Sequence, residues 1–210
     1  MLRCFRILCL LLFVTSAALS VSADTVTYTF ESPQFTVGER TSLLDRAPNS
    51  GLTTFRTSFT SSPEANGFQI LNFQPNVLFS GQMLYDPSFP NESLRLSFNM
   101  PIDRVQVNFA VLEPGRLDLT SPVGSVSQNS AVVGGDFQGG TLIFSSATPF
   151  TSFRLDAFGR LGNPNLFAID NLVLNTAAAI PEPTTMLLLG SGLAGIAAKV
   201  RKRRKADREE

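Results

Sequence analysis

The chain has 210 residues, with 17 basic side chains that balance 17 acidic ones, and it contains no histidine and no tryptophan. Its two cysteines are Cys4 and Cys9, so His-based hydrolytic triads are excluded, as are ordinary zinc sites and cysteine nucleophiles beyond residue 9. The zero net charge hides an uneven distribution, because residues 24–180 hold thirteen acids, eight arginines and no lysine, a net charge of −5. Because this segment has no lysine, it can form neither a lysine Schiff base nor a P-loop. Its negative charge makes it poorly suited to binding nucleic acid.

The first residues have the organisation of a secretory signal peptide. Two arginines precede an apolar run at residues 7–18, and small residues at 21–23 form a cleavage site. We therefore expect a signal peptide at 1–23 and a mature chain that begins near Asp24. Both cysteines lie in the removed part, and Leu8 before Cys9 is not the small residue of a lipoprotein site. The mature protein is predicted to have no thiol, no disulfide and no lipid anchor.

Residues 24–175 show the period-two alternation of half-buried β-strands. Apolar and polar residues alternate at 25–30, at 94–99 and at 104–111. Further strands are predicted at 68–73, 77–80, 116–120, 131–133, 141–145, 150–155 and 166–174. Proline and glycine turns separate them, residues 36–63 should contain loop as well as strand, and no helix of three turns stands out. The pattern predicts a single all-β domain, an antiparallel β-sandwich of jelly-roll type.

The core of this domain should form from the apolar faces of its strands, because the mature chain has no cross-link to stabilise it. The residues predicted to be buried there are Val105, Val107, Phe109, Phe144 and Phe153.

The end of the chain combines a linker, an apolar helix and a basic cluster. Residues 176–183 form a linker with the sequence Pro-Glu-Pro at its end, and the two prolines should delay the helix until about Thr184. Residues 184–200 contain one charge, Lys199, and show no polar face, which favours a membrane-spanning helix over a buried amphipathic one; their length is at the short limit of roughly 17 residues. The basic tail at 201–210 should remain cytoplasmic.

This tail resembles the PEP-CTERM sorting signal, which is also known as an ice-binding protein C-terminal domain. Pro181, Glu182 and Pro183 match the motif residue by residue, and the helix and basic end match it in kind. The resemblance implies recognition by an exosortase-type processing enzyme in a Gram-negative envelope. It implies an inner-membrane-anchored precursor that is cleaved near the proline motif and delivered to the cell surface or to extracellular polymer.

Two segments near the end of the domain resemble the final strands of jelly-roll domains that often precede this signal. They are residues 148–155 and 167–174, and such domains are similar to galactose-binding and carbohydrate-binding modules. The resemblance implies that a calcium ion could lie between the first and last strands, near Glu31 and Asp170, where carboxylate oxygens would suit it. Clusters with EF-hand spacing are absent, so no metal site and no cofactor are predicted.

Few side chains suggest a ligand, and the ligand stays unknown. Most of the sixteen phenylalanines after residue 23 should be core, while Phe89 and Phe158 are expected in loops. A glycan would use Tyr85 with Asp86 and Asn91, because an amphipathic ring suits a sugar platform.

The sequence favours a non-enzymatic protein of the cell surface or extracellular matrix, with a structural or adhesive role. Its expected partners are the exosortase-type enzyme, the membrane through the helix at 184–200, and extracellular polysaccharide, but not nucleic acid. The alternative is a glycan-binding module. A carboxylate-dependent glycan hydrolase comes third, because it would need two acids that converge in a cleft.

Overall fold

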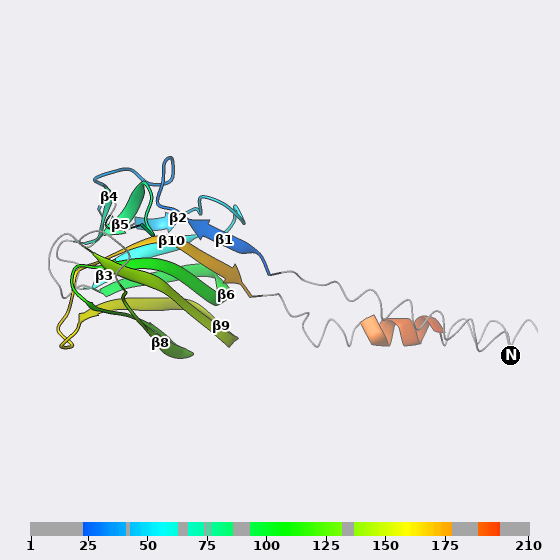
Figure 1. The fold of residues 1–210 in the computed structure, drawn as a ribbon. Coiled ribbons are helices and arrows are strands. Elements are labelled where there is room, and N and C mark those ends of the chain that lie inside the picture. The colour runs from blue at the N-terminus through cyan, green and yellow to red at the C-terminus, as the bar shows by residue number, and fades with distance from the viewer. Residues whose placement is uncertain are drawn as a thin grey trace, which may run out of the picture. The chain divides into compact units, whose positions relative to one another are not determined.

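The computed structural model describes residues 23–40, 43–62, 67–73, 75, 77–85, 93–131, 137–177 and 189–197. These residues fall into two compact units (Figure 1). One unit is Ala23–Ala177, which contains all the described strands. Outside it, the described part of the chain is a helix at residues 189–197.

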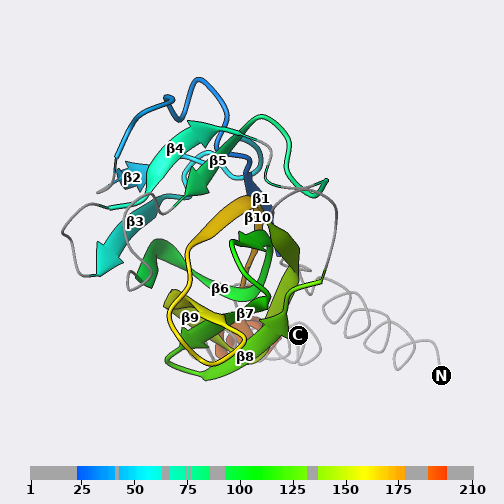
Figure 2. The ribbon, with the colours of Figure 1, turned by 60° about the vertical axis from the view of Figure 1, so that its left-hand side comes forward.

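Ten strands make up the Ala23–Ala177 unit, and every named pair of neighbours is antiparallel. They are β1 (Thr25–Tyr28), β2 (Leu43–Arg46), β3 (Thr57–Ser62), β4 (Gln69–Asn72), β5 (Gln82–Tyr85), β6 (Ser93–Val111), β7 (Gly115–Ser121), β8 (Gly124–Asn129), β9 (Gln138–Gly159) and β10 (Phe167–Thr176). The main strand order is β4-β5-β10-β6-β9-β7-β8 (Figures 1 and 2). In addition, β1 pairs with β10, β3 pairs with β6, and β2 pairs with β3. The prediction of an antiparallel, all-β fold is confirmed, whereas its jelly-roll detail stays a prediction.

Two long strands, β6 and β9, divide this sheet into two halves. We call β4, β5, β10, β1 and the adjoining segments 102–111 and 138–145 the first half-sheet. The second half-sheet consists of β2, β3, β7, β8 and the segments 93–97 and 152–159. Each long strand thus passes from one half into the other.

Bulges lie where the long strands pass between the halves. The six residues of β6 from Ser97 to Ile102 face the shorter stretch from Phe150 to Ser152, and residues 146–149 of β9 have no register partner. Pro101 and Pro149 fall in these bulges, where a residue without an amide donor breaks no ladder hydrogen bond. The sequence therefore suggested two strands in each case, and the structure joins them into one.

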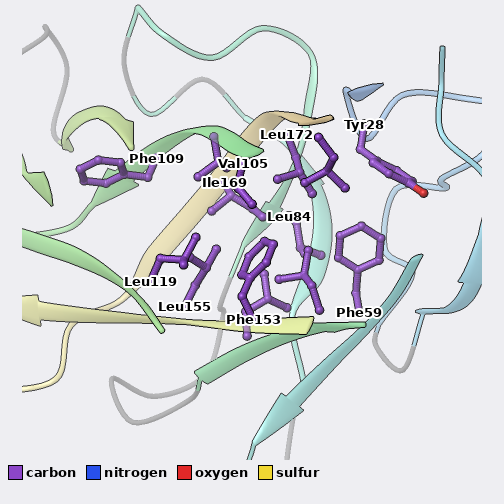
Figure 3. Packing of buried hydrophobic residues seen from close by; sticks show 14 of the residues in the cluster. Tyr28, Phe59, Leu84, Val105, Phe109, Leu119, Phe153, Leu155, Ile169 and Leu172 are labelled. Carbon is purple, nitrogen blue, oxygen red and sulfur yellow. The ribbon is translucent and has the colours of Figure 1, made fainter. Parts of the chain in front are cut away.

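The core lies between the two half-sheets. Figure 3 shows Val105, Phe109 and Ile169 of the first half above Leu119, Leu155 and Phe153 of the second. Val105, Val107 and Phe109 are fully buried and Phe153 is 2% exposed, as predicted. Phe144 is only partly buried, because it packs at the margin of the core against Phe150. This two-layer core agrees with the predicted sandwich.

Other predicted elements need correction. Residues 77–80 form a loop, and the strand follows at β5. Of residues 131–133, Ala131 makes an isolated bridge and the other two lie outside the described residues. The strand β8 was not predicted, because its sequence Gly-Ser-Val-Ser-Gln-Asn has a single apolar residue, Val126.

Candidate functional site

The predicted sorting motif lies mostly outside the described part of the chain. Pro181, Glu182 and Pro183 are not described, and neither are the signal peptide at 1–23, except for its last residue, and the basic tail at 201–210. The described helix at 189–197 falls within the predicted span at 184–200. Among the residues that the structure describes, no helix has both the length and the apolar character needed to cross a bilayer.

A polar junction forms in the first half-sheet where two strands share one edge of β10. Strand β5 pairs with Ala168 and Ile169, and β1 pairs with the residues from Leu172 onward, which leaves Asp170 and Asn171 between them. Asn171 has a φ of 48°, in the left-handed region, and the β10–β6 register shifts after Asp170. Asp170, 1% exposed, follows Ile169 of the core and shares the outer side with Ala168 by strand alternation, and the bulge comes directly after it.

The same junction brings Glu31 close to Asp170, through the loop that precedes β5. The Ser80 amide donates to Asp170 Oδ2 at 3.4 Å, and the Gln82 amide donates to Glu31 Oε1 at 2.7 Å. Gly81 lies between them with a φ of 75°, and a Cβ there would overlap Glu31 Oε1. The predicted proximity of the two acids is therefore seen, although Glu31 follows the end of β1 by three residues instead of ending it.

Burial sets the chemistry of this junction. It raises the pKa of Asp170 to about 7, and nearby Glu31 adds to the rise, while hydrogen bonds from the Asn171 and Ser80 amides oppose it. Within the described part of the chain, no group of three or more acidic, histidine or cysteine side chains gathers to hold a metal ion. The buried Asp170 carboxyl is shielded from solvent, so it is poorly placed to touch a substrate.

The aromatic residue suggested for glycan binding, Tyr85, lies on the outer side of the first half-sheet. Its ring is 6.3 Å from that of Phe137, which is in turn 6.0 Å from Phe73, both in edge-on contacts. Tyr85 and Phe137 belong to a cluster that we call the outer apolar cluster; its buried members are Phe79, Met83, Ala110, Phe137 and Ala168. Tyr85 thus packs sideways against another ring, while Asp86, Phe89 and Asn91 lie outside the described residues.

The outer side of the second half-sheet is polar. On β7 and β9, Asp118 is the register partner of Asp156, and each has an arginine two residues earlier in its own strand. Arg116 Nε donates to both oxygens of Asp118, at 2.9 and 3.2 Å, and Arg154 Nε donates to Asp156 Oδ2 at 2.7 Å. Neither aspartate was proposed from the sequence, although the repeated Arg-x-Asp spacing was a visible signal.

More arginines extend this polar surface. Arg95 of β6 is the register partner of Arg154, and both side chains are exposed. Beyond β9, Arg160 and Arg116 line an open hollow of about 270 Å³ with Asn129 and Ser130. We call the outward side chains Arg95, Arg116, Asp118, Arg154, Asp156 and Arg160 the arginine–aspartate face. Phe158, expected in a loop, lies in β9 under the Arg116 guanidinium, whose carbon is 5.1 Å from the ring centre.

Comparison with known proteins identifies the end of the chain. Residues 179–204 match the PEP-CTERM protein-sorting motif, which confirms the resemblance seen in the sequence. The chain therefore carries a protein-sorting motif at this end, which implies export. No curated protein sequence matches the chain.

Solved structures with some likeness to the chain include carbohydrate-binding modules. A mutant of a family 29 carbohydrate-binding module is 11% identical, with a TM-score of 0.35, and the match covers 74% of this chain and 94% of that one. Another family 29 module has 12% identity and a TM-score of 0.33, over 76% and 96%. The enzymatically active domain of bacteriophage CBA120 tailspike protein 4 has 14% identity and a TM-score of 0.31, over 58% and 19%. At these scores the likeness transfers neither a ligand nor an activity.

Proposed function

We propose that this chain is exported to the surface or extracellular matrix of a Gram-negative bacterium, where its β domain has a structural or adhesive role. The observation that carries the proposal is the sorting motif at residues 179–204. A signal peptide at 1–23 would direct export and be removed during translocation, and an exosortase-type enzyme would complete the processing near Pro181, Glu182 and Pro183. The cysteine-free sequence after residue 9 supports a domain that needs no oxidative folding.

In the precursor, residues 184–200 would span the inner membrane and leave residues 201–210 in the cytoplasm. The described helix at 189–197 supports the helical part of this proposal. Two features of the sequence support the orientation: the span has one charge, at Lys199, and a basic cluster follows it.

Intact-mass measurement of protein released from the surface tests this route. In a host with the sorting enzyme, the released protein should begin near Asp24 and lack the basic tail. Replacing Pro181 and Pro183 by alanine should keep the tail attached and the protein in the inner membrane, whereas Pro122→Ala, in an exposed turn, should be processed normally. Released protein that still carries residues 199–210 would contradict sorting and leave a single-pass anchor.

A second candidate function is glycan binding, which the arginine–aspartate face favours. Carboxylate and guanidinium groups form directional hydrogen bonds with sugar hydroxyls and sugar acids. A glycan hydrolase is less well supported, because Asp118 and Asp156 lie on an open sheet face and each is paired with an arginine. A glycosidase requires its two carboxyls in a cleft that holds the scissile bond.

A further inference from the structure

Two arginines face each other in register at the centre of the second half-sheet. Arg95 and Arg154 are directly opposed on β6 and β9, with Thr60 and Thr120 as the next partners on the flanking strands. Like charges directly opposite each other destabilise a sheet. Because both side chains are exposed, an anion that bridges them would relieve this repulsion without burying a charge.

The guanidinium groups have donors to spare for such an anion. Arg116 and Arg154 use Nε for their aspartate partners, so the two terminal nitrogens of each have no hydrogen bond to the described residues. Arg95 and Arg160 form no ion pair within the described part of the chain. A guanidinium has five N–H donors and matches a carboxylate with two parallel bonds.

The arginines form two pairs separated by acids. Arg95 and Arg154 form one pair, and Arg116 and Arg160 at the open hollow form the other. Arg116 is the register partner of Phe158, four residues along β9 from Arg154, so the pairs are about 13 Å apart at about 3.3 Å per residue. Asp118 and Asp156 lie between them. Along the strands the face therefore alternates basic, acidic and basic.

We propose that the arginine–aspartate face binds an acidic polysaccharide in which uronic acids alternate with neutral sugars. This inference rests on the second candidate function, glycan binding. Each arginine pair holds the carboxylate of one uronic acid, and Asp118 and Asp156 accept hydrogen bonds from hydroxyls of the neutral sugar between them. Ser62, the register partner of Ser93, and Ser127 beside Asp118 add further hydroxyls at the same level, while the Ser93 hydroxyl donates to Asp156 Oδ1.

The acidic pair selects against other polyanions. Nucleic acid carries a charge on every phosphate, so Asp118 and Asp156 would repel the phosphates that lie between the arginine pairs. A polysaccharide made only of uronic acids meets the same repulsion. The charge order of the face thus matches an alternating chain better than a uniform one.

The test compares the binding of full-length protein, purified in detergent, to four probes. Hyaluronan oligosaccharides alternate a uronic acid with a neutral sugar, polygalacturonate is uniformly acidic, dextran is neutral, and a short DNA duplex is a uniform polyanion. We expect the tightest binding to hyaluronan, weakened by salt. The variant Arg95→Gln/Arg154→Gln should lose about tenfold or more in affinity, while the control Arg104→Gln, an exposed arginine in the first half-sheet, should bind as the parent does.

A second variant addresses selectivity. Asp118→Asn/Asp156→Asn should bind polygalacturonate more tightly than the parent does, because the central repulsion is removed. The inference is overturned if the arginine variant binds hyaluronan unchanged, if DNA or polygalacturonate binds the parent as tightly as hyaluronan, or if the face instead pairs two copies of the chain. If the Arg95→Gln/Arg154→Gln variant still binds dextran, the protein binds glycans, but not through the arginine–aspartate face. Only the proposed site would then be wrong. Absence of binding to all three glycans would overturn both.

Discussion

The two half-sheets share β6 and β9 but present opposite outer surfaces. On the first half, the outward residues Ala110, Ala168 and Met83 are covered by Phe79 and Phe137 of the neighbouring loops. On the second half, the outward residues are mostly serines, threonines and charged side chains, and the one outward ring on β9, Phe158, lies under the Arg116 guanidinium. The covering is confined to the part of the first half-sheet around Ala110, Ala168 and Met83, because β6 also carries the exposed Arg104 on that half. The difference shows that covering loops decide which outer surface stabilises the fold and which can bind a ligand, even where both surfaces share the same strands.

The largest effect is expected in the core that both halves share. Phe109 is fully buried, and its ring lies 3.1 Å from the position that a Cβ of residue 140 would take. Phe109→Ala should therefore reduce the free energy of unfolding by roughly 3 to 5 kcal/mol. Denaturant titration measures this, with Ile143→Ala, 47% exposed on β9, as the matched control that should change little. Equal effects of the two changes would show that the inward face of the first half-sheet is wrongly assigned.

The second expected effect is a pH dependence from Asp170 under the covered surface. Its folded pKa is raised to about 7 from an ordinary value of 3.8. Below about pH 4 the Asp170 carboxyl is protonated in both the folded and the unfolded state. As the pH rises to about 7, the unfolded state ionises first. The free energy of unfolding therefore falls over this range, by up to about 4 kcal/mol. Denaturation of the parent and of Asp170→Asn across pH 4 to 8 should show a flatter profile for the variant. The exposed Glu113→Gln should leave the parent profile unchanged, and a parent stability that rises over this range would contradict the assignment.

The third prediction asks whether the outer apolar cluster is structural. Phe137 is 8% exposed and contacts both Tyr85 and Phe73. Its replacement by alanine should cost roughly 2 kcal/mol, less than at Phe109 because Phe137 belongs to the smaller outer apolar cluster and is not fully buried. Phe73→Ala, at a ring that is 47% exposed, should cost well under half as much. Thermal melting distinguishes them, and a negligible change at Phe137 would make the cluster an open platform rather than a cover.

The smallest predicted effect is a gain in stability on the polar surface. Replacing Arg95 by glutamine removes a charge that faces Arg154 in register. The domain should become more stable by roughly 0.2 to 1 kcal/mol at low salt, and the gain should shrink as salt screens the pair. Arg104→Gln, which faces Ser145 and not another arginine, should show no such salt-dependent gain. Loss of stability on replacing Arg95 would mean that this arginine has a favourable partner.

The sequence predicted what depends on local patterns. Alternation found the strands around Val26, Leu96 and Val107, and the order of proline motif, apolar run and basic cluster identified the sorting signal. It did not predict that β6 and β9 continue through Pro101 and Pro149, because proline normally ends a central strand and only the bulge geometry accommodates it.

The candidate surface was hidden for a related reason. The opposition of Arg95 to Arg154 and of Asp118 to Asp156 depends on strand register, which no local pattern gives. Residues 77–80 read as an apolar strand, but their side chains Leu78 and Phe79 cover the outside of the first half-sheet instead of joining it. Long-range pairing thus decided both which surface is covered and which charges meet.

Hydroxyl-radical footprinting of the full-length protein, with and without hyaluronan oligosaccharides, tests the contrast between the two surfaces most directly. The account predicts that the glycan protects side chains of the second half-sheet, such as Arg154 and Phe158, which lies under Arg116. The labelling of Phe73 and Tyr85 on the first half-sheet should not change. Protection of Phe73 and Tyr85 with no change at Phe158 would contradict it, because the covered surface would then be the one that binds.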